Sequence, residues 1–425
     1  MTTGPRTGIY LQTAADIGER LVRDAIWYGQ RCNWMGALPA DQRSAGRRAE
    51  AAYRSLGPDL YQGTSGIALF LAQLYAAGGD AAVRRAALGA IRHALDFADS
   101  RGETNRRGLY SGWVGIAFAA ARVAVLLGEH ALLSPARHLV ERALAEGEDE
   151  QDFDLLGGKA GTIVAMLALR ELLPEPCSTE TALSLGDALL HSAQRSDEGY
   201  SWRSASAPTA RNLTGFSHGT AGAGYALLEL FRATNDARFR DGADGAFRYE
   251  RHWFDADAGN WPDFREQPAR RNRGRHAGVC STYWCHGAPG IALSRLRAYA
   301  ALGDSVCAME ARTALRTTRA TVETALDSGL GSHSLCHGLS GNIEALLYGE
   351  EILGTECSEA AALAHRVADA GIERYAAVSA WPCGAGGGET PGLMLGLAGI
   401  GYSYLRLSVP TTPSILIVQP EQYAN

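Results

Sequence analysis

Seven times in the sequence the pattern Gly-x-x-Gly is followed by an apolar run. Successive first glycines lie 49, 46, 61, 68, 51 and 58 residues apart, which leaves room in each unit for two helices and their connections. One helical hairpin cannot bury its apolar face alone, so the units must stack as an open solenoid or a closed ring. The seven pairs are Gly63/Gly66, Gly112/Gly115, Gly158/Gly161, Gly219/Gly222, Gly287/Gly290, Gly338/Gly341 and Gly396/Gly399.

The runs that follow the glycines are rich in Ala and Leu, which favours helices over strands. Runs such as 67–77, 116–127 and 162–173 suit an inner, buried ring. The more polar, amphipathic runs at 82–98, 135–145 and 360–375 suit an outer ring. We therefore expect one all-α domain over residues 1–425. Residues 240–280 interrupt the repeat with polar residues and are expected to be an inserted loop or short strands.

Composition narrows the class of protein. The net charge of −6 gives no reason to expect a nucleic-acid partner. The sequence has no 18-residue uncharged apolar stretch, and its first ten residues lack a hydrophobic signal core, so we expect no membrane segment and a cytoplasmic location. Eight cysteines are scattered along a long chain, which favours reduced thiols or metal ligands over disulfides.

The residues just before each glycine pair should lie where a loop enters an inner helix, so that their side chains meet at one end of the ring. Packing gives no reason for cysteine or histidine at these positions, yet units four, five and six carry three histidines and two cysteines there. We interpret this cluster as a site. The two positions hold Tyr61–Gln62, Tyr110–Ser111, Leu156–Gly157, Ser217–His218, Cys285–His286, Cys336–His337 and Met394–Leu395.

Cys285, Cys336 and His337 supply two thiolates and an imidazole, donors that suit Zn²⁺. Three protein ligands leave the fourth tetrahedral position open for water or substrate, as in catalytic zinc sites. The alternative is that both cysteines are packing residues, since buried free cysteines are common. Their equivalent positions in adjacent repeats favour the metal site.

Four segments carry a further signature: GFSHGTAG (215–222), YWCHGAPGI (283–291), LCHGLSGN (335–342) and GLMLGLAGIGYSYL (392–405). Together they resemble the lanthionine synthetase C family, the cyclases of lanthipeptide biosynthesis. The resemblance extends to stand-alone cyclases and to the cyclase domains of fused lanthipeptide synthetases. It implies an α/α toroid of seven inner and seven outer helices, a zinc ion at its mouth and a dehydrated precursor peptide as substrate.

In this family a peptide cysteine adds to dehydroalanine or dehydrobutyrine and forms a (methyl)lanthionine thioether. The resemblance implies that His218 is the acid/base residue and that Asp154 orients it or stabilises its charged form. His286 stands where family members carry His or Tyr, and it could hydrogen-bond the enolate or the sulfur. A capping or packing role is the alternative for each of these residues.

Some stand-alone cyclases carry an arginine four residues before the first zinc cysteine, where this chain has Ser281. Arg273 or Arg275 could supply the charge from the inserted loop. Cys280 and His333 lie close in sequence to the ligands, but a further permanent ligand would block the open position.

Two alternatives to the cyclase hypothesis use the same residues. An enzyme of this kind could instead add glutathione or another small thiol to dehydroamino acids, or the chain could be a non-catalytic peptide-binding scaffold of a synthetase complex. A separate dehydratase or kinase/lyase of the same pathway is an expected partner. The inserted loop is expected to contact an acidic peptide through Trp253, Trp261, Arg270, Arg271, Arg273 and Arg275.

Overall fold

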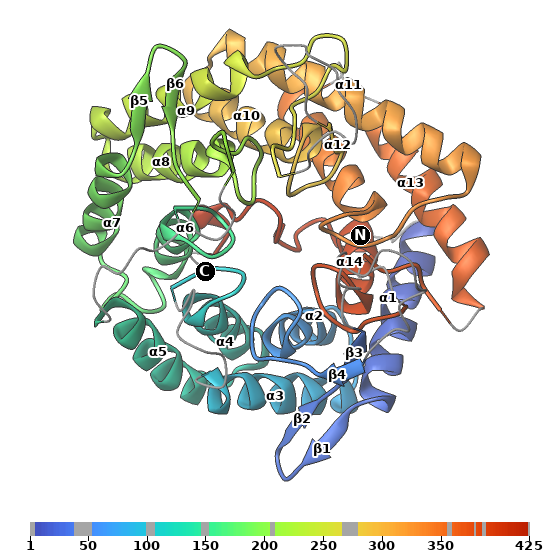
Figure 1. The fold of residues 1–425 in the computed structure, drawn as a ribbon. Helices are drawn as coiled ribbons and strands as arrows, with labels where there is room; N and C mark the ends of the chain where they lie inside the picture. The colour runs from blue at the N-terminus through green and yellow to red at the C-terminus, as the bar shows by residue number, and fades with distance from the viewer. Residues whose placement is uncertain are drawn as a thin grey trace.

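The computed structural model describes residues 5–37, 53–98, 107–145, 153–204, 209–265, 279–354, 359–377, 380–384 and 388–423. Over these residues the α-helices form two concentric rings (Figure 1). The inner ring holds α2 (Thr64–Ala76), α4 (Trp113–Leu127), α6 (Lys159–Leu169), α8 (Thr220–Thr234), α10 (Ala288–Leu302), α12 (Leu339–Leu353) and α14 (Leu397–Ser408). The outer ring holds α1 (Pro5–Arg23), α3 (Ala81–Asp96), α5 (Leu133–Ala145), α7 (Thr179–His191), α9 (Ala237–His252), α11 (Ser305–Ser328) and α13 (Ala360–Gly371).

This arrangement confirms the expected α/α toroid of seven inner and seven outer helices. The β-structure of the described residues is confined to three antiparallel hairpins and isolated bridges. The hairpins pair β1 (Ile26–Tyr28) with β2 (Arg31–Asn33), β3 (Met35–Ala37) with β4 (Tyr53–Ser55), and β5 (Gln194–Ser196) with β6 (Gly199–Ser201). Among the helices described, none combines the length and the apolar character that a membrane crossing requires.

Burial separates the two rings as the sequence pattern predicts. In α4 nearly every residue is buried, including Arg122, because the helix has neighbours on all sides. The outer helix α3 buries one face and leaves Arg84 partly exposed and Arg85 exposed, as an amphipathic helix does. The N-terminal helix α1 packs against α14, so the first and last helices of the chain complete the final pair of the ring.

Backbone hydrogen bonds close the ring at the end where the inner helices begin. In each unit a residue of the loop before the inner helix donates its N–H to the corresponding carbonyl of a neighbouring unit, and the last unit returns to the first. The bonds run Tyr61→Tyr110 (2.8 Å), Tyr110→Leu156 (2.9 Å), Leu156→Ser217 (3.2 Å), Ser217→Cys285 (3.1 Å), Trp284→Cys336 (3.1 Å), Cys336→Met394 (2.9 Å) and Met394→Tyr61 (2.8 Å).

The same loops explain the second glycine of each pair. A Cβ at Gly290 would lie 2.1 Å from the carbonyl oxygen of Trp284, and one at Gly341 would lie 1.9 Å from that of Leu335. In all seven units the obstacle is the carbonyl six residues earlier, at 1.7 to 2.3 Å. The repeat therefore needs glycine there because the loop folds back against the first turn of its own helix.

The C-terminal residues 413–419, here called the axial segment, run through the middle of the inner ring (Figure 1). Ile415, Leu416, Ile417 and Val418 are each at most 2% exposed. The carbonyls of this segment accept hydrogen bonds from inner-ring side chains: Tyr402 (2.8 Å, to Pro413), Tyr110 (2.6 Å, to Ile415), Trp284 (2.9 Å, to Leu416) and Tyr225 (to Val418).

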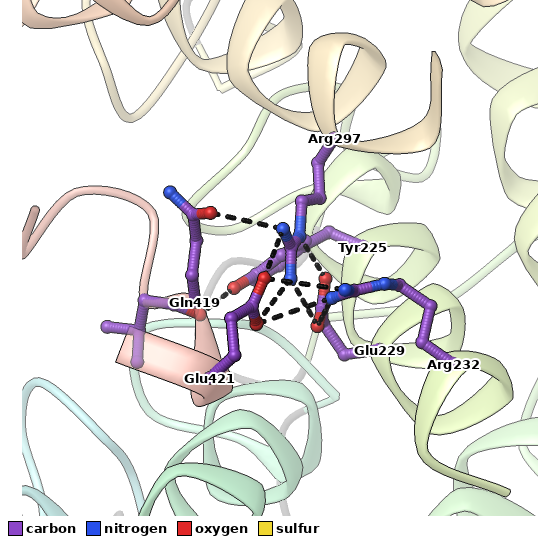
Figure 2. A network of polar contacts seen from close by, with 7 residues as sticks. Tyr225, Glu229, Arg232, Arg297, Gln419 and Glu421 are labelled. Atoms are coloured by element: carbon purple, nitrogen blue, oxygen red, sulfur yellow. Dashed lines mark hydrogen bonds and ion pairs between the residues drawn. The ribbon is translucent and has the colours of Figure 1, made fainter. Parts of the chain in front are cut away.

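A buried ionic network fixes the residues that follow (Figure 2). Arg297 of α10 lies 2.5 Å from Glu229 of α8 and 2.8 Å from Glu421, and it donates to Gln419 at 3.1 Å. Arg297 is 5% exposed and Glu229 is 2% exposed. The chain end is thus bound to two inner helices at the end of the ring where those helices finish.

One sequence expectation for the fold was wrong. Residues 240–252 are helical and belong to α9, so the insertion begins only after His252. Phe239, Ala243, Ala246 and Phe247 form one buried face, but the intervening charges and two glycines hide this period in the sequence. Beyond α9, the described part of the insertion is held by antiparallel bridges between Asp255 and Asn260 and between Asp263 and Val279.

Candidate active site

The loops before α10 and α12 bring Cys285, Cys336 and His337 together. Their ligand atoms all lie within 4.8 Å of one another, with both cysteines buried and the histidine partly exposed. The bond from Trp284 N–H to the Cys336 carbonyl sets the register of the two loops. Residues 51 positions apart therefore form one cluster because their units are neighbours in the ring.

Among the described cysteines, Cys285 alone has a lowered pKa, whereas the pKa of Cys336 is raised like those of the others. A hydrogen bond from Cys336, together with His337, lowers the pKa of Cys285 well below its usual value. Burial raises the pKa of Cys280 to about 11 and that of Cys307 to about 12. The seven cysteines in the described residues are all free, which agrees with the expectation of thiols rather than disulfides.

Two cysteine sulfurs and one imidazole fit a zinc ion by donor type, and as three ligands they leave a fourth tetrahedral position. Tyr61 contributes a further contact, because its hydroxyl hydrogen-bonds Cys336. Burial raises the pKa of Tyr61 well above its usual value, so this hydroxyl stays a neutral donor toward the sulfur. Sequence reasoning did not select Tyr61, although it occupies the same repeat position as Cys336.

His218 and Asp154 form a hydrogen-bonded pair beside this cluster. Nδ1 of His218 lies 2.6 Å from Oδ2 of Asp154, while Oδ1 of the same carboxylate accepts from the Gly157 N–H at 2.7 Å. Burial lowers the pKa of His218, but the hydrogen bond and charge of Asp154 outweigh it, so the pKa of His218 is raised. The pair therefore favours a protonated imidazole.

His286 stacks on His218, with ring centroids 5.8 Å apart. Burial lowers the pKa of His286 to about 4, so its imidazole is neutral near pH 7. Neither ring nitrogen has a hydrogen-bond partner among the described residues, although Nδ1 lies 3.7 Å from Oδ2 of Asp263. Two stacked histidines thus carry opposite pKa shifts.

The loops that carry these residues are supported from behind. Glu250 of α9 accepts from the N–H groups of Gly215 and Ala221, at 3.1 and 2.7 Å, and so holds the loop of His218. Asn260 accepts from Ala288 N–H at 2.9 Å and donates to the Ser281 carbonyl at 3.2 Å, which holds the loop of Cys285. The inserted segment is therefore built into the site.

Other residues considered from the sequence lie apart from the cluster. His333 packs between Tyr375 and Trp381, with ring centroids 5.5 and 5.7 Å away, and is a packing residue. Neither His333 nor Cys280 joins the group of ligand atoms found in the described residues. Ser281 turns its carbonyl toward Gly287, where a Cβ would lie 1.7 Å from that oxygen. This close approach and the φ of 92° explain the glycine.

The expected peptide contacts of the inserted loop are not supported for its tryptophans. Trp253 is 8% exposed and Trp261 is 2% exposed, and the Trp261 indole donates to the Glu250 carbonyl at 3.0 Å. Both rings are therefore buried and are not available to a peptide at the surface. Arg270, Arg271, Arg273 and Arg275 lie outside the described residues.

A comparison with protein-family models identifies the family of this chain. The model for "Lanthionine synthetase C-like protein" matches residues 54–418, which is most of the chain. The chain belongs to the lanthionine synthetase C-like family. This confirms the resemblance given by the glycine and Cys-His motifs.

One solved structure, nisin cyclase, shares this fold. Nisin cyclase matches with a TM-score of 0.60 at 20% sequence identity, covering 86% of this chain and 91% of that one. A family 76 glycoside hydrolase from a bovine Bacteroides thetaiotaomicron strain matches with a TM-score of 0.48 at 12% identity, covering 94% and 77%. An unsaturated glucuronyl hydrolase specific for heparin gives 0.44 at 15%, covering 73% and 83%. The two hydrolase similarities are too low to bear on function.

Proposed function

We propose that the chain is a zinc-dependent lanthipeptide cyclase that adds cysteine thiolates of a dehydrated precursor peptide to dehydroalanine or dehydrobutyrine. The observation that carries the proposal is the clustering of Cys285, Cys336 and His337 beside a histidine whose pKa an aspartate raises. A nucleophile site and a proton donor are the two requirements of this addition.

Cys285, Cys336 and His337 would hold the zinc. When bound, zinc would supply Lewis acidity that keeps a substrate thiol as its thiolate, whereas a free thiol has a pKa of about 8.5. The buried surroundings of both cysteines exclude water from one side of this position. Exclusion of water strengthens every charge interaction in the site.

His218 would deliver the proton that completes the addition. Attack of the sulfur on the β-carbon leaves an enolate, and the Nε2–H of a protonated His218 can protonate its α-carbon. Asp154 holds Nδ1, so the opposite nitrogen is the one that can face the substrate. His286, neutral because burial lowers its pKa to about 4, would serve as a hydrogen-bond partner and not as an acid.

The inner ring gives the site a closed floor. Trp284, directly before Cys285, packs edge-on against Tyr110 and Phe216 and donates to the carbonyl of Leu416 in the axial segment. These residues are at most 1% exposed. The substrate would therefore approach from the mouth, where the loops before the inner helices lie. This geometry suits a cysteine and a dehydroamino acid of one flexible peptide.

The direct test is cyclisation of a dehydrated precursor by the zinc-loaded protein, followed by mass spectrometry after alkylation of free thiols. Loss of alkylation without a change in peptide mass would identify ring formation. His218→Ala and His218→Asn should retain zinc but slow the reaction by about 10²- to 10⁴-fold. Rates equal to that of the wild-type protein would contradict the assignment of His218.

The same assay separates the small-thiol alternative. With glutathione in excess, a cyclase should still form rings within the peptide, because the peptide holds its own thiol near the acceptor. Glutathione adducts in place of rings would instead support an enzyme that adds small thiols. A separate dehydratase or kinase/lyase would supply the dehydroamino acids, since their formation from Ser or Thr is a different reaction.

A further inference from the structure

Arg265 is a cation fixed at the edge of the site by a nearly buried carboxylate. Its Nε and Nη2 donate to Asp263 at 3.1 and 2.8 Å, and its backbone N–H donates to the same carboxylate at 3.0 Å. Asp263 is held in turn, because its N–H donates to the Val279 carbonyl at 2.8 Å. The Arg265 side chain is 36% exposed while that of Asp263 is 2% exposed, so the guanidinium has one protected edge and one open edge.

Contacts connect this ion pair to the candidate active site. Oδ2 of Asp263 lies 3.7 Å from Nδ1 of His286, whose ring stacks on that of His218. Arg265 is therefore linked through Asp263 to His286, and through the stacked rings to His218.

The guanidinium retains hydrogen-bonding capacity. It carries five N–H donors, and the ion pair with Asp263 engages only Nε and Nη2 among the contacts of the described residues. Since Asp263 fixes its plane, the remaining donors are oriented in advance. A guanidinium held in this way is suited to binding an oxygen anion.

The addition creates such an anion. As the carbon–sulfur bond forms at the β-carbon, the π electrons of the double bond move toward the adjoining carbonyl and give an enolate oxygen. Protonation of the α-carbon by His218 then restores the carbonyl and leaves a neutral thioether. Donors placed where charge develops stabilise the transition state more than the ground state.

We propose that Arg265 binds the carbonyl oxygen of the dehydroamino acid and stabilises the enolate that forms there. This rests on the proposed cyclase function and assigns a residue that the sequence motifs do not reach. In this role Arg265 supplies a positive charge that some stand-alone cyclases carry as an arginine at the position of Ser281. Asp263 is a positioning residue, because it acts through Arg265.

A binding experiment tests the role without catalysis. In 3-mercaptopropionate two carbons separate the sulfur from the carboxylate carbon, as in the enolate adduct, and 3-mercaptopropanamide is its neutral counterpart. Calorimetric titration of the zinc-loaded wild-type protein should favour the acid by about tenfold, and Arg265→Gln should abolish that preference. Comparing the acid-to-amide ratio between proteins cancels the difference in thiol pKa between the two probes. An equal ratio in wild type and Arg265→Gln would overturn the proposal.

Kinetics provide the second test. With the dehydrated precursor, Arg265→Gln should lower kcat by about 10²- to 10³-fold with little change in KM or zinc content, and Arg265→Lys should recover part of the rate. Arg240→Gln, on the exposed face of α9, is the matched control and should retain full activity.

Arg265→Gln leaves the Asp263 carboxylate unpaired, so the double variant Arg265→Gln/Asp263→Asn provides a neutral pair in case the single variant does not fold. Full activity of either folded variant would overturn the role of Arg265 alone. No cyclisation by the zinc-loaded wild-type protein would instead contradict the proposed function, and the role of Arg265 with it.

Discussion

Asp154 gives the two stacked histidines, His218 and His286, different protonation states near neutral pH. His218 and His286 are of one residue type and pack face to face, yet their pKa values move in opposite directions. The difference arises because Asp154 hydrogen-bonds His218 and not His286, whose pKa is set mainly by burial. A group that must donate a proton near neutral pH needs a raised pKa, so we assign the proton donor to His218 and the neutral hydrogen-bond partner to His286.

Replacing Asp154 should move the pH dependence in a defined direction. In Asp154→Asn the burial that lowers the pKa of His218 is no longer outweighed, so His218 should lose its proton at lower pH than in the wild-type protein. The alkaline limb of kcat/KM for cyclisation should therefore shift to lower pH, and the maximal rate should fall. A pH–rate profile measures both effects. An unshifted alkaline limb would mean that His218 is not the group titrating there.

Sequence reasoning found the residues that the repeat places at fixed positions. The cysteines and histidines before the glycine pairs stood out because a helix junction does not require such residues. Arg265 was missed because it lies in the insertion, where no period relates position to space. Tyr61 was overlooked because tyrosine at a buried junction has an ordinary packing explanation.

The junction between each loop and its inner helix places the candidate site residues at one end of the ring. Each second glycine admits the carbonyl six residues earlier, and in unit five that carbonyl belongs to Trp284, next to Cys285. A side chain at Gly290 would also lie 2.5 Å from the Cβ of Phe216 in unit four. The position therefore couples the metal-ligand loop to the neighbouring unit.

Gly290→Ala should consequently destabilise the protein and disturb the site. We expect a loss of about 1–3 kcal/mol in the free energy of unfolding, because the added methyl group overpacks a closed junction. Zinc affinity should fall with it. Gly8→Ala is the matched control, since a Cβ at Gly8 in α1 meets no atom within 4 Å and should stabilise the helix by up to about 1 kcal/mol. Denaturant titration of both variants checks this, and equal midpoints would refute the explanation.

The helices themselves were largely predictable, and the exceptions have physical reasons. The Ala- and Leu-rich runs bounded by glycine predicted the inner helices, because a helix that is buried on all sides is apolar on all sides. The outer helix α9 was misread because nearly half of its residues are charged and two are glycine, so burial of one face outweighs its weak propensity. Helix α1 lies before the first glycine pair and has no repeat signal.

In the molecule as a whole, segments near the two ends of the chain complete the two helical rings. Helix α1 fills the last place in the outer ring, and the axial segment fills the middle of the inner ring (Figure 1). The repeat spacing is compatible with an open solenoid or a closed ring, so it does not predict that the ring closes. Closure follows from contacts between distant residues, such as Met394 N–H with the Tyr61 carbonyl.

The ionic network of Figure 2 should make the chain end important for stability. Arg297→Ala would leave the Glu229 carboxylate, 2% exposed, without its closest cation and should cost about 3–5 kcal/mol. Arg316→Ala, on the exposed side of α11, should change stability by less than about 0.5 kcal/mol. Denaturant unfolding compares the two variants, and equal stabilities would contradict a structural role for the network.

The central claim is that ring closure assembles a zinc site from Cys285, Cys336 and His337. Elemental analysis of the purified protein tests it most directly. The wild-type protein should hold about one zinc per chain, Cys336→Ala should lose most of it, and Cys307→Ala, at a buried cysteine of α11, should retain it. Stoichiometric zinc in a folded variant that lacks all three ligand residues would contradict the claim.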